Sequence, residues 1–332
     1  MAYTAIDDPE AYFQVQLYTG NGSANNAITL GGDTDMQPDL VWIKNRDATD
    51  AHCLFDSVRG ATKVIHSDTT GAETTDADTL DSFTSDGFQV DADVKVNTNT
   101  EKYVAWCWKE SATAGFDILT YTGNATNRTI SHNLSAVPQV VIVKRRDAVT
   151  AWSSLHLAIG DSTDRMVLND SAALEDDATM WQDTDPTSSV FSLGTSSSTN
   201  VNTGTYVAYL WAPIQGFSKF GTYEGNNNAD GTFVYTGFSV AYVLVKNIDA
   251  SGPKWTIQDT KRSPSLGGNP AEARLHPNDT TVEEADSDID LLSNGFKIRS
   301  TGSYTNDAET YIYMAFAEAP FVNSNGVPCN AV

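Results

Sequence analysis

The sequence predicts an all-β protein made of three tandem β-sandwich domains, jelly-roll-like and about 100 residues each, with little helix. Two observations predict this class. The apolar stretches are short, rich in Val, Ile, Tyr, Trp and Phe, and separated by clusters of Gly, Asn, Asp and Ser, as strands and turns are. The same series of segments also occurs three times, with a period that suits one sandwich rather than one solenoid repeat.

The first repeated element is a turn. The tetrad "YTGN" stands at residues 18–21 and again at 121–124, and "YEGN" stands at 223–226. These positions are 103 and then 102 residues apart. Gly and Asn are typical of tight turns, so the tetrad predicts the end of an opening strand in each repeat.

The second repeated element is an apolar strand that ends in charge: "PDLVWIKNRDA" (38–48), "PQVVIVKRRDA" (138–148) and "VAYVLVKNIDA" (240–250). Each carries a lysine followed three residues later by an aspartate: Lys44 and Asp47, Lys144 and Asp147, Lys246 and Asp249. Because the first two segments are apolar on both faces, they predict central strands packed on each side.

Two further elements complete the pattern. A Phe-centred strand stands at "SDGFQVD" (85–91) and "SNGFKIR" (293–299), with a degenerate "SSVFSLG" (188–194) in the middle copy. Each repeat closes with "YVAWCWKE" (103–110), "YVAYLWAP" (206–213) or "YIYMAFAEAP" (311–320). The alternation of apolar and polar residues in 88–96 predicts one strand with a solvent-exposed face. The segment "AEARLH" (271–276) predicts a turn or two of helix.

These landmarks divide the chain into five parts. We expect an N-terminal arm at 1–12, repeat 1 at 13–112, repeat 2 at 113–214, repeat 3 at 215–321 and a C-terminal tail at 322–332. The peptide linkers "SATAG" (111–115) and "PIQG" (213–216) consist of small residues or of Pro and Gly, which commonly interrupt helices and strands.

Tryptophans and the repeated lysine and aspartate residues are the candidate contact groups. Trp42, Trp106, Trp108 and Trp211 fall in strands, where large rings fill sandwich cores more often than they form sugar-stacking platforms. Trp152 and Trp255 follow the lysine segments and are expected at an exposed domain edge. The lysine and aspartate pairs fit either a shared ligand site or, more simply, an aspartate that caps the turn beside a solvated lysine. The expected contact surface comprises Trp152, Trp255, Lys44, Asp47, Lys144, Asp147, Lys246 and Asp249.

The charge excludes one class of partner. The chain has 20 Lys and Arg against 43 Asp and Glu, a formal charge of −23. Such a surface repels nucleic acid, which is bound through Lys and Arg.

The sequence also has no apolar stretch of about 20 residues, so no membrane span is expected. The acidic N-terminal segment lacks the pattern of a secretory signal.

The sequence contains none of the common catalytic or cofactor motifs. It has no nucleophile elbow, no phosphate-binding loop and no Cys or His spacing that favours zinc, so we expect no cofactor and no catalytic residue. Residues 286–297 begin like an EF-hand loop but lack its Gly and Glu. Two alternatives stay open: a weakly bound ion in the acidic loops 76–82 and 175–179, and glycosidase activity, which needs only two carboxylates. Threefold repetition of a whole domain favours a multiplied surface over an enzyme.

Several segments of repeat 1 resemble a known family. "IDDPEAYFQVQLYTGNG", "QPDLVWIKNRDA", "LFDSVRGA", "LDSFTSDGFQV" and "YVAWCWKE" are similar to a repeated domain of unassigned biochemical function in structural proteins of marine tailed bacteriophages. The ending "EAPFVNSNGVPCNAV" is similar as well, whereas repeats 2 and 3 depart from the pattern. The resemblance implies a virion component assembled in the host cytoplasm, and it supplies no catalytic residues. Family members are often labelled tail or fibre proteins.

Three functions remain open. The first is a tail-fibre or tail-appendage component that presents β-sandwich domains for host adsorption, with a host-surface polysaccharide as a further partner. The second is a capsid decoration protein that stabilises the head. The third, of another class, is a polysaccharide-binding or polysaccharide-degrading protein. The first two imply other virion proteins as partners and a homo-oligomer.

Overall fold

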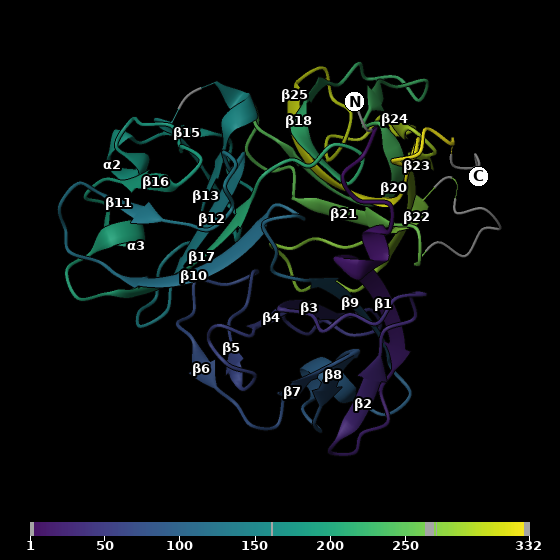
Figure 1. Cartoon of the computed structure of the whole chain (residues 1–332), viewed down its shortest axis with the longest axis horizontal. Helices are drawn as coiled ribbons and strands as arrows, with labels where there is room; N and C mark the ends of the chain where they lie inside the picture. The colour runs from purple at the N-terminus through teal and green to yellow at the C-terminus, as the bar shows by residue number, and fades with distance from the viewer. Residues whose placement is uncertain (1–2, 161, 263–268, 270, 329–332) are drawn as a thin grey trace.

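The predicted all-β class is confirmed. The computed structural model describes residues 3–160, 162–262, 269 and 271–328, and it consists mainly of antiparallel strands with a few single-turn helices. Figure 1 shows three lobes grouped around a common centre. Within the described residues, no helix is long and apolar enough to cross a membrane.

Repeat 1 is a sandwich of two sheets. The larger sheet has the order β1 (Phe13–Thr19), β9 (Lys102–Trp108), β3 (Leu40–Asn45), β4 (Cys53–Asp56). The smaller sheet has the order β2 (Asn26–Thr29), β8 (Gly87–Val90), β7 (Leu80–Thr84). Short elements complete the repeat: η1 (Pro9–Ala11), β5 (Lys63–Val64), β6 (Thr74–Thr75) and α1 (Val94–Asn97).

Repeat 2 follows the same plan with a wider main sheet. Its order is β10 (Phe116–Thr122), β17 (Thr205–Trp211), β12 (Val140–Arg145), β13 (Ser153–His156), β14 (Asp164–Val167), β15 (Glu175–Asp176). The second layer pairs β11 (Arg128–Ser131) with β16 (Val190–Leu193). The short helices are η2 (Leu157–Ile159), α2 (Ala178–Trp181) and α3 (Ser197–Asn200).

Repeat 3 has the largest second layer. Its main sheet has the order β18 (Ser218–Glu224), β25 (Thr310–Pro320), β20 (Phe238–Asn247), β21 (Thr256–Asp259). The facing sheet has the order β19 (Phe233–Tyr235), β24 (Gly295–Ile298), β23 (Glu284–Leu292), β22 (Ala271–Arg274).

The repeated lysine segments occupy the same topological place in all three sheets. Each lies on an inner strand (β3, β12 or β20) that pairs with the last strand of its repeat (β9, β17 or β25). The lysine is paired there with the corresponding apolar residue: Lys44 with Val104, Lys144 with Val207, and Lys246 with Ile312. The three similar segments of the sequence are therefore equivalent strands of three similar sandwiches.

The glycine of each turn tetrad is required by a close backbone approach. A Cβ at Gly20 would lie 2.1 Å from the carbonyl oxygen of Thr98, and one at Gly123 would lie 2.2 Å from that of Val201. The corresponding distance at Gly225 is 1.9 Å. No side chain fits at such distances, so the repeated glycine is a packing requirement of this turn.

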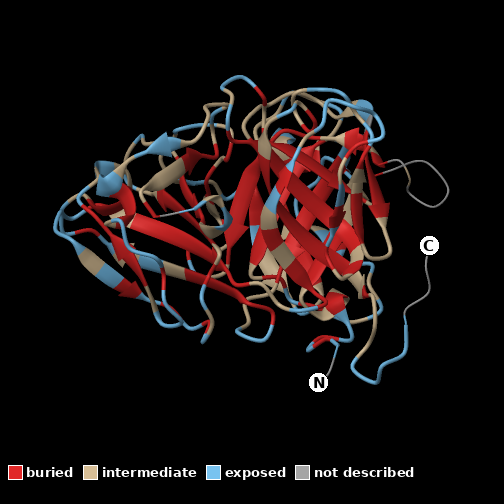
Figure 2. Cartoon of the chain, turned by 90° about the horizontal axis from the view of Figure 1, so that it is seen from above, coloured by how far each residue is buried: buried red, intermediate tan, exposed pale blue. Residues whose placement is uncertain are grey.

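The strands that carry the lysines are buried on both faces, as predicted. In β3, Val41 and Ile43 face the core of their own sandwich. Leu40 and Trp42, on the opposite face, belong to a second core that contains residues of all three repeats. The main sheets thus pack against their own second layer on one side and against neighbouring repeats on the other. Figure 2 shows the strands buried and the peripheral loops exposed.

The four strand tryptophans are buried, but they lie between the repeats and do not fill the core of a single sandwich as expected. Trp42, Trp106, Trp108 and Trp211 all belong to the core shared by the repeats, whereas the separate core of repeat 1 contains no tryptophan. At the centre the ring of Trp108 contacts those of Trp211 and Phe316, with centroids 6.4 Å and 5.7 Å apart. Phe316 stands in repeat 3 where the other two repeats have tryptophan, so this cluster marks a pseudo-threefold axis.

Two local predictions are wrong. Residues 88–96 form the end of β8 and the beginning of α1 rather than one strand, because Asp93 caps α1 with its side chain. The segment 271–276, predicted as helix, contains β22, because pairing with β23 overrides the helix propensity of its Ala and Glu residues.

We predict that Gly123→Ala lowers the free energy of unfolding by about 2 kcal/mol, because the added methyl group must displace backbone at Val201. Urea denaturation measures the change. The matched control is Gly71→Ala, whose Cβ would meet only the Thr69 hydroxyl at 3.3 Å. Equal stabilities of the two variants would contradict the close-approach explanation.

Candidate functional site: the joints between the repeats

The joint between repeats 1 and 2 is a buried network of charges. Arg59 donates through Nε to Asp56 at 2.5 Å, and both side chains are fully buried. The hydroxyl of Tyr209, from repeat 2, donates to the same carboxylate at 2.7 Å. Glu73 accepts from Arg59 and also from Arg146 of repeat 2, at 3.2 Å and 2.8 Å. Two repeats together satisfy the groups that neither satisfies alone.

The joint between repeats 3 and 1 repeats this network. Arg262 donates to Asp259 at 2.6 Å, and both side chains are again fully buried. The indole Nε1 of Trp106, from repeat 1, donates to Asp259 at 3.0 Å. Glu283 accepts from Arg262 at 3.3 Å and from Arg46 of repeat 1 at 2.6 Å. The guanidinium of Arg262 also lies over the Trp106 ring.

The joint between repeats 2 and 3 has the same position but different chemistry. His156 replaces the buried aspartate and donates through Nε2 to the carbonyl oxygen of Tyr313 at 3.2 Å. Ile159 stands three residues later, where the other joints have arginine, and Leu174 and Ile248 replace the outer Glu and Arg. Ile159 and Leu174 pack against the shared core that includes Ile248. Burial lowers the pKa of His156 to about 4, although its bond to Tyr313 opposes this, so the imidazole is neutral at pH 7.

One backbone hydrogen bond is common to all three joints. The amide of Glu73 donates to the carbonyl of Arg146 at 2.8 Å, that of Glu283 to Arg46 at 3.0 Å, and that of Leu174 to Ile248 at 2.8 Å. The joints therefore share a backbone geometry and run head to tail, from repeat 1 to 2, from 2 to 3 and from 3 back to 1. The three repeats form a closed ring.

The repeated lysines lie inside the ring and not on its surface. Lys44 and Lys144 are 0% exposed, and Lys246 is 1% exposed. Lys144 donates to the carbonyl of Thr70 in repeat 1 at 3.0 Å, and Lys246 approaches that of Ser171 in repeat 2 at 3.5 Å. Lys44 donates to carbonyls of its own loop. The expectation of a solvated lysine is wrong, because all three ammonium groups are buried and two of them contact the neighbouring repeat.

Burial lowers the pKa of all three lysines to about 8. For Lys44 the nearby carboxylates Asp50 and Asp68 partly oppose the effect, and for Lys246 Asp170 and Glu309 do so. The second cause at Lys144 is the like charge of Arg145, which lowers the pKa further. Backbone carbonyl oxygens, rather than carboxylates, hold these ammonium groups in place.

The two tryptophans expected at an exposed edge are also buried in the joints. Trp152 is 0% exposed and donates to the carbonyl of His66 in repeat 1 at 2.9 Å. Trp255 is 2% exposed and donates to that of Val167 in repeat 2 at 3.1 Å. His52 holds the corresponding place in repeat 1. The contact surface predicted from these residues is therefore corrected: they contact other repeats of the same chain.

The aspartates of the repeated pairs are exposed, but in repeats 1 and 3 they bind the start of another strand rather than cap their own turns as the simpler interpretation expected. Asp47 accepts from the backbone amide of Lys102 at 2.8 Å, and Asp249 accepts from that of Thr310 at 2.7 Å. In repeat 2, Asp147 forms an ion pair with Arg145 at 2.7 Å. Each carboxylate thus has a local structural role at the start of the last strand of its repeat, β9, β17 or β25.

The acidic segments considered for metal ions are engaged in other contacts. Asp286 and Asp288 lie on β23 and pair with Arg274, and Asp290 pairs with Arg299. Asp76 accepts from the backbone amide of Asp78. Within the part of the chain that the structure describes, no three His, Cys, Asp or Glu side chains are grouped as metal ligands are.

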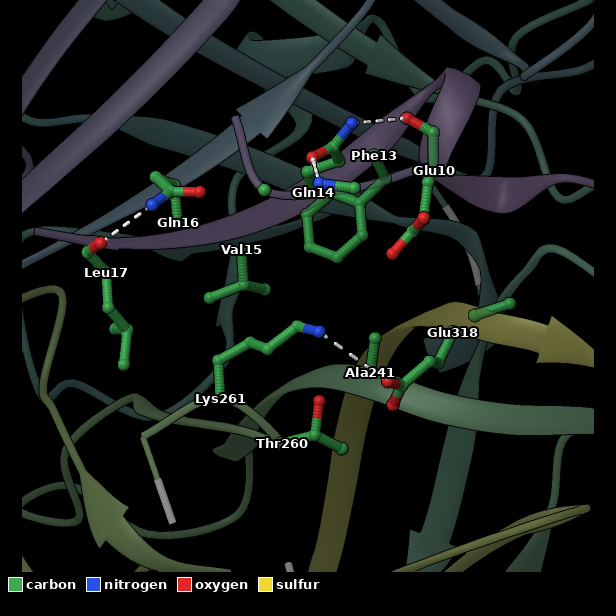
Figure 3. Close-up of a pocket in the computed structure, with 13 residues that line it drawn as sticks. Glu10, Phe13, Gln14, Val15, Gln16, Leu17, Ala241, Thr260, Lys261 and Glu318 are labelled. Carbon is green, nitrogen blue, oxygen red and sulfur yellow. Dashed lines mark hydrogen bonds and ion pairs between the residues drawn. The ribbon is translucent and has the colours of Figure 1, made fainter. Parts of the chain in front are cut away.

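A cavity of about 250 Å³ lies beside the joint between repeats 3 and 1 (Figure 3). Its wall is formed by β1 on one side and, on the other, by β20, β25 and the two residues that follow β21. Gln14 points along this wall but is held by the carbonyl of Glu10 and the amide of Gly32. Lys261 extends toward Glu318, with a separation of 3.8 Å. Gln14 and Lys261 are thus engaged, whereas the buried hydroxyl of Thr260 in the same lining has no hydrogen-bond partner among the described residues.

A comparison with protein families gives one match. A family described as a domain of unknown function, DUF7483, matches residues 8–320. The chain belongs to this family. The DUF7483 match spans all three repeats of this chain. Neither a curated protein nor a solved structure matches the chain.

The charged residues of the joints were not predicted from the sequence, although a signal was present. "DSVR" (56–59) and "DTKR" (259–262) carry the same Asp-x-x-Arg spacing, and "HLAI" (156–159) replaces it in repeat 2. The glutamates that complete the networks follow at different distances, 14 residues after Arg59 and 21 after Arg262. Only the shared backbone geometry shows that they are equivalent.

We predict that Arg59→Met lowers the free energy of unfolding by about 3 to 5 kcal/mol, because it leaves Asp56 as a buried charge without its cation. Tyr209→Phe removes one hydrogen bond to the same carboxylate and should cost about 1.5 to 3 kcal/mol. Denaturant unfolding with thermal scans measures both. A smaller effect for Arg59→Met than for Tyr209→Phe would contradict this ranking.

We predict that Lys144 makes stability rise with pH between about 8 and 10.5. The folded-state pKa of about 8 lies below the ordinary value of 10.5, so the unfolded chain binds more protons in this window and deprotonation favours folding. In Lys144→Met, the gain in unfolding free energy from pH 8 to 9.5 should be smaller than in the wild type by about 1.5 kcal/mol. Parallel pH dependences in the two proteins would refute the buried-ammonium account.

Proposed function

We propose that this DUF7483 protein is a structural, non-enzymatic component of a bacteriophage virion. The phage setting comes from the family resemblance of the repeat 1 segments. The observation that carries the structural role is the closed ring. The features that recur in the sequence, namely the tetrad glycine, the lysine and the joint residues, serve to build one rigid body from three sandwiches.

Within the virion, we place the protein in a tail fibre or tail appendage that contacts the host. A rigid body with three sandwiches exposes many loops at its periphery while its strands stay buried, which suits the presentation of a binding surface (Figure 2). Its net charge of −23 disfavours contact with the packaged genome and favours an outer position on the particle. Other virion proteins would hold it in place.

The pseudo-threefold arrangement favours a second candidate, a capsid decoration protein. Three similar modules around one axis match the surroundings of a threefold or local threefold position on a capsid, where three equivalent subunits meet. In this role each repeat would contact one of the three subunits.

Quantitative mass spectrometry of purified particles tests the proposal and separates the two roles. A virion component is present in purified particles, on the order of tens of copies for an appendage and hundreds for decoration of an icosahedral head. Gold-labelled antibody against the protein should mark the tail in the first case and the head in the second. Absence of the protein from particles released by lysis would overturn the virion assignment.

A further inference from the structure

Exposed aromatic rings gather in one region of the described chain. The residues concerned are Tyr3, Phe233 and Tyr235, which are 58%, 45% and 54% exposed. The other described Phe, Tyr and Trp side chains are absent from the set of exposed large hydrophobic residues. Tyr3 and Tyr235 line the same cavity, and Phe233 lies two residues before Tyr235 on the same outer face of β19.

The other two repeats show that the fold does not need these rings. The buried residue of β19, Val234, pairs with Phe296 in the same way that Ile28 pairs with Phe88 and Ile130 with Phe191. The outward neighbours of the two isoleucines are Ala27 and Thr29 in repeat 1, and Thr129 and Ser131 in repeat 2. Repeat 3 replaces these small residues with Phe233 and Tyr235, of which about half stays exposed.

The cavity beside these rings has the size and lining of a small-ligand site. Its volume is about 310 Å³, and it is formed by the peptide linker between repeats 2 and 3 (213–216), the start of β18, the turn after β19 and both terminal segments. Tyr3, Tyr235 and Phe321 supply aromatic rings to its wall. Gln215, Ser218 and Thr236 supply polar groups. Lys219 holds the Tyr235 backbone by donating to its carbonyl at 2.6 Å, and its ammonium lies 5.5 Å from the ring centre.

We propose that this aromatic cavity binds a short segment of a neutral polysaccharide, which deepens the proposed adsorption role and rests on it. A pyranose ring presents C–H groups on its faces and hydroxyls at its edge, so it stacks on a tyrosine ring while its hydroxyls bond to polar neighbours. The net charge of −23 repels acidic polymers. The three rings and the single cavity are also small beside a protein interface, which needs about 800 Å² on each partner.

Affinity electrophoresis in native gels that contain dextran, mannan, galactan or alginate tests the proposal on the purified full-length chain. We expect at least one of the three neutral polymers to retard the wild type, and alginate, which is acidic, to leave its mobility unchanged. Tyr235→Ser should weaken the retardation about fivefold, the loss expected for one stacking contact. Phe233→Thr should weaken it less, because Phe233 lies outside the cavity lining.

The substitutions are matched to the chain itself. Ser and Thr are the residues that repeat 2 carries at the corresponding positions, so both variants should fold, and circular dichroism checks this. Thr129→Phe places an equivalent ring on repeat 2 without the cavity and should not increase retardation. Wild-type protein that no neutral polymer retards, or Tyr235→Ser retarded as strongly as wild type, would overturn the proposal. Loss of the protein from particles on Tyr235→Ser, without binding in the gels, would identify a virion contact instead and overturn it as well.

Discussion

The structure depends on buried charges that two repeats must share. Asp56 and Asp259 lie in the interior, and a buried carboxylate is costly unless cations and hydrogen-bond donors surround it. Each has an arginine from its own repeat and a Tyr or Trp donor from the neighbouring one. The second donor is supplied only when the repeats are docked in the observed order. The charged joints therefore couple the correct folding of each sandwich to closure of the ring.

The third joint shows what the charges contribute. There Ile159, Leu174 and Ile248 replace the ionic network on the same backbone geometry. Buried ion pairs and apolar contacts of similar volume often have comparable stability, so the networks are not needed for strength alone. They make the joints chemically different. If a repeat with a charged joint docked against an apolar one, its buried Asp would lose the Tyr or Trp donor and its outer Glu would lose the Arg that the neighbouring repeat supplies. This loss disfavours misordered rings and open chains of head-to-tail contacts.

The sequence allowed the fold class, the repeats and the two-sided burial of the lysine strands to be predicted, because these follow from local pattern and period. It did not allow the placement of Trp152, Trp255 and the lysines to be predicted. A tryptophan in the loop after a strand looks the same whether solvent or a neighbouring repeat covers it, and here the neighbour covers it. Glu73 and Glu283 were missed for a related reason, since their equivalence is set by the backbone and not by sequence spacing. The aromatic cavity combines residues from both ends of the chain and from β19, so no local pattern indicates it.

The central claim is that side-chain joints, rather than the peptide linkers, hold the three repeats together. A protease site inserted between Ala112 and Thr113, which are exposed in the linker between repeats 1 and 2, tests it most directly. After complete cleavage, repeat 1 and the fragment of repeats 2 and 3 should elute together in size-exclusion chromatography at the volume of the uncut chain. Elution of the two fragments as separate species under native conditions would contradict the account.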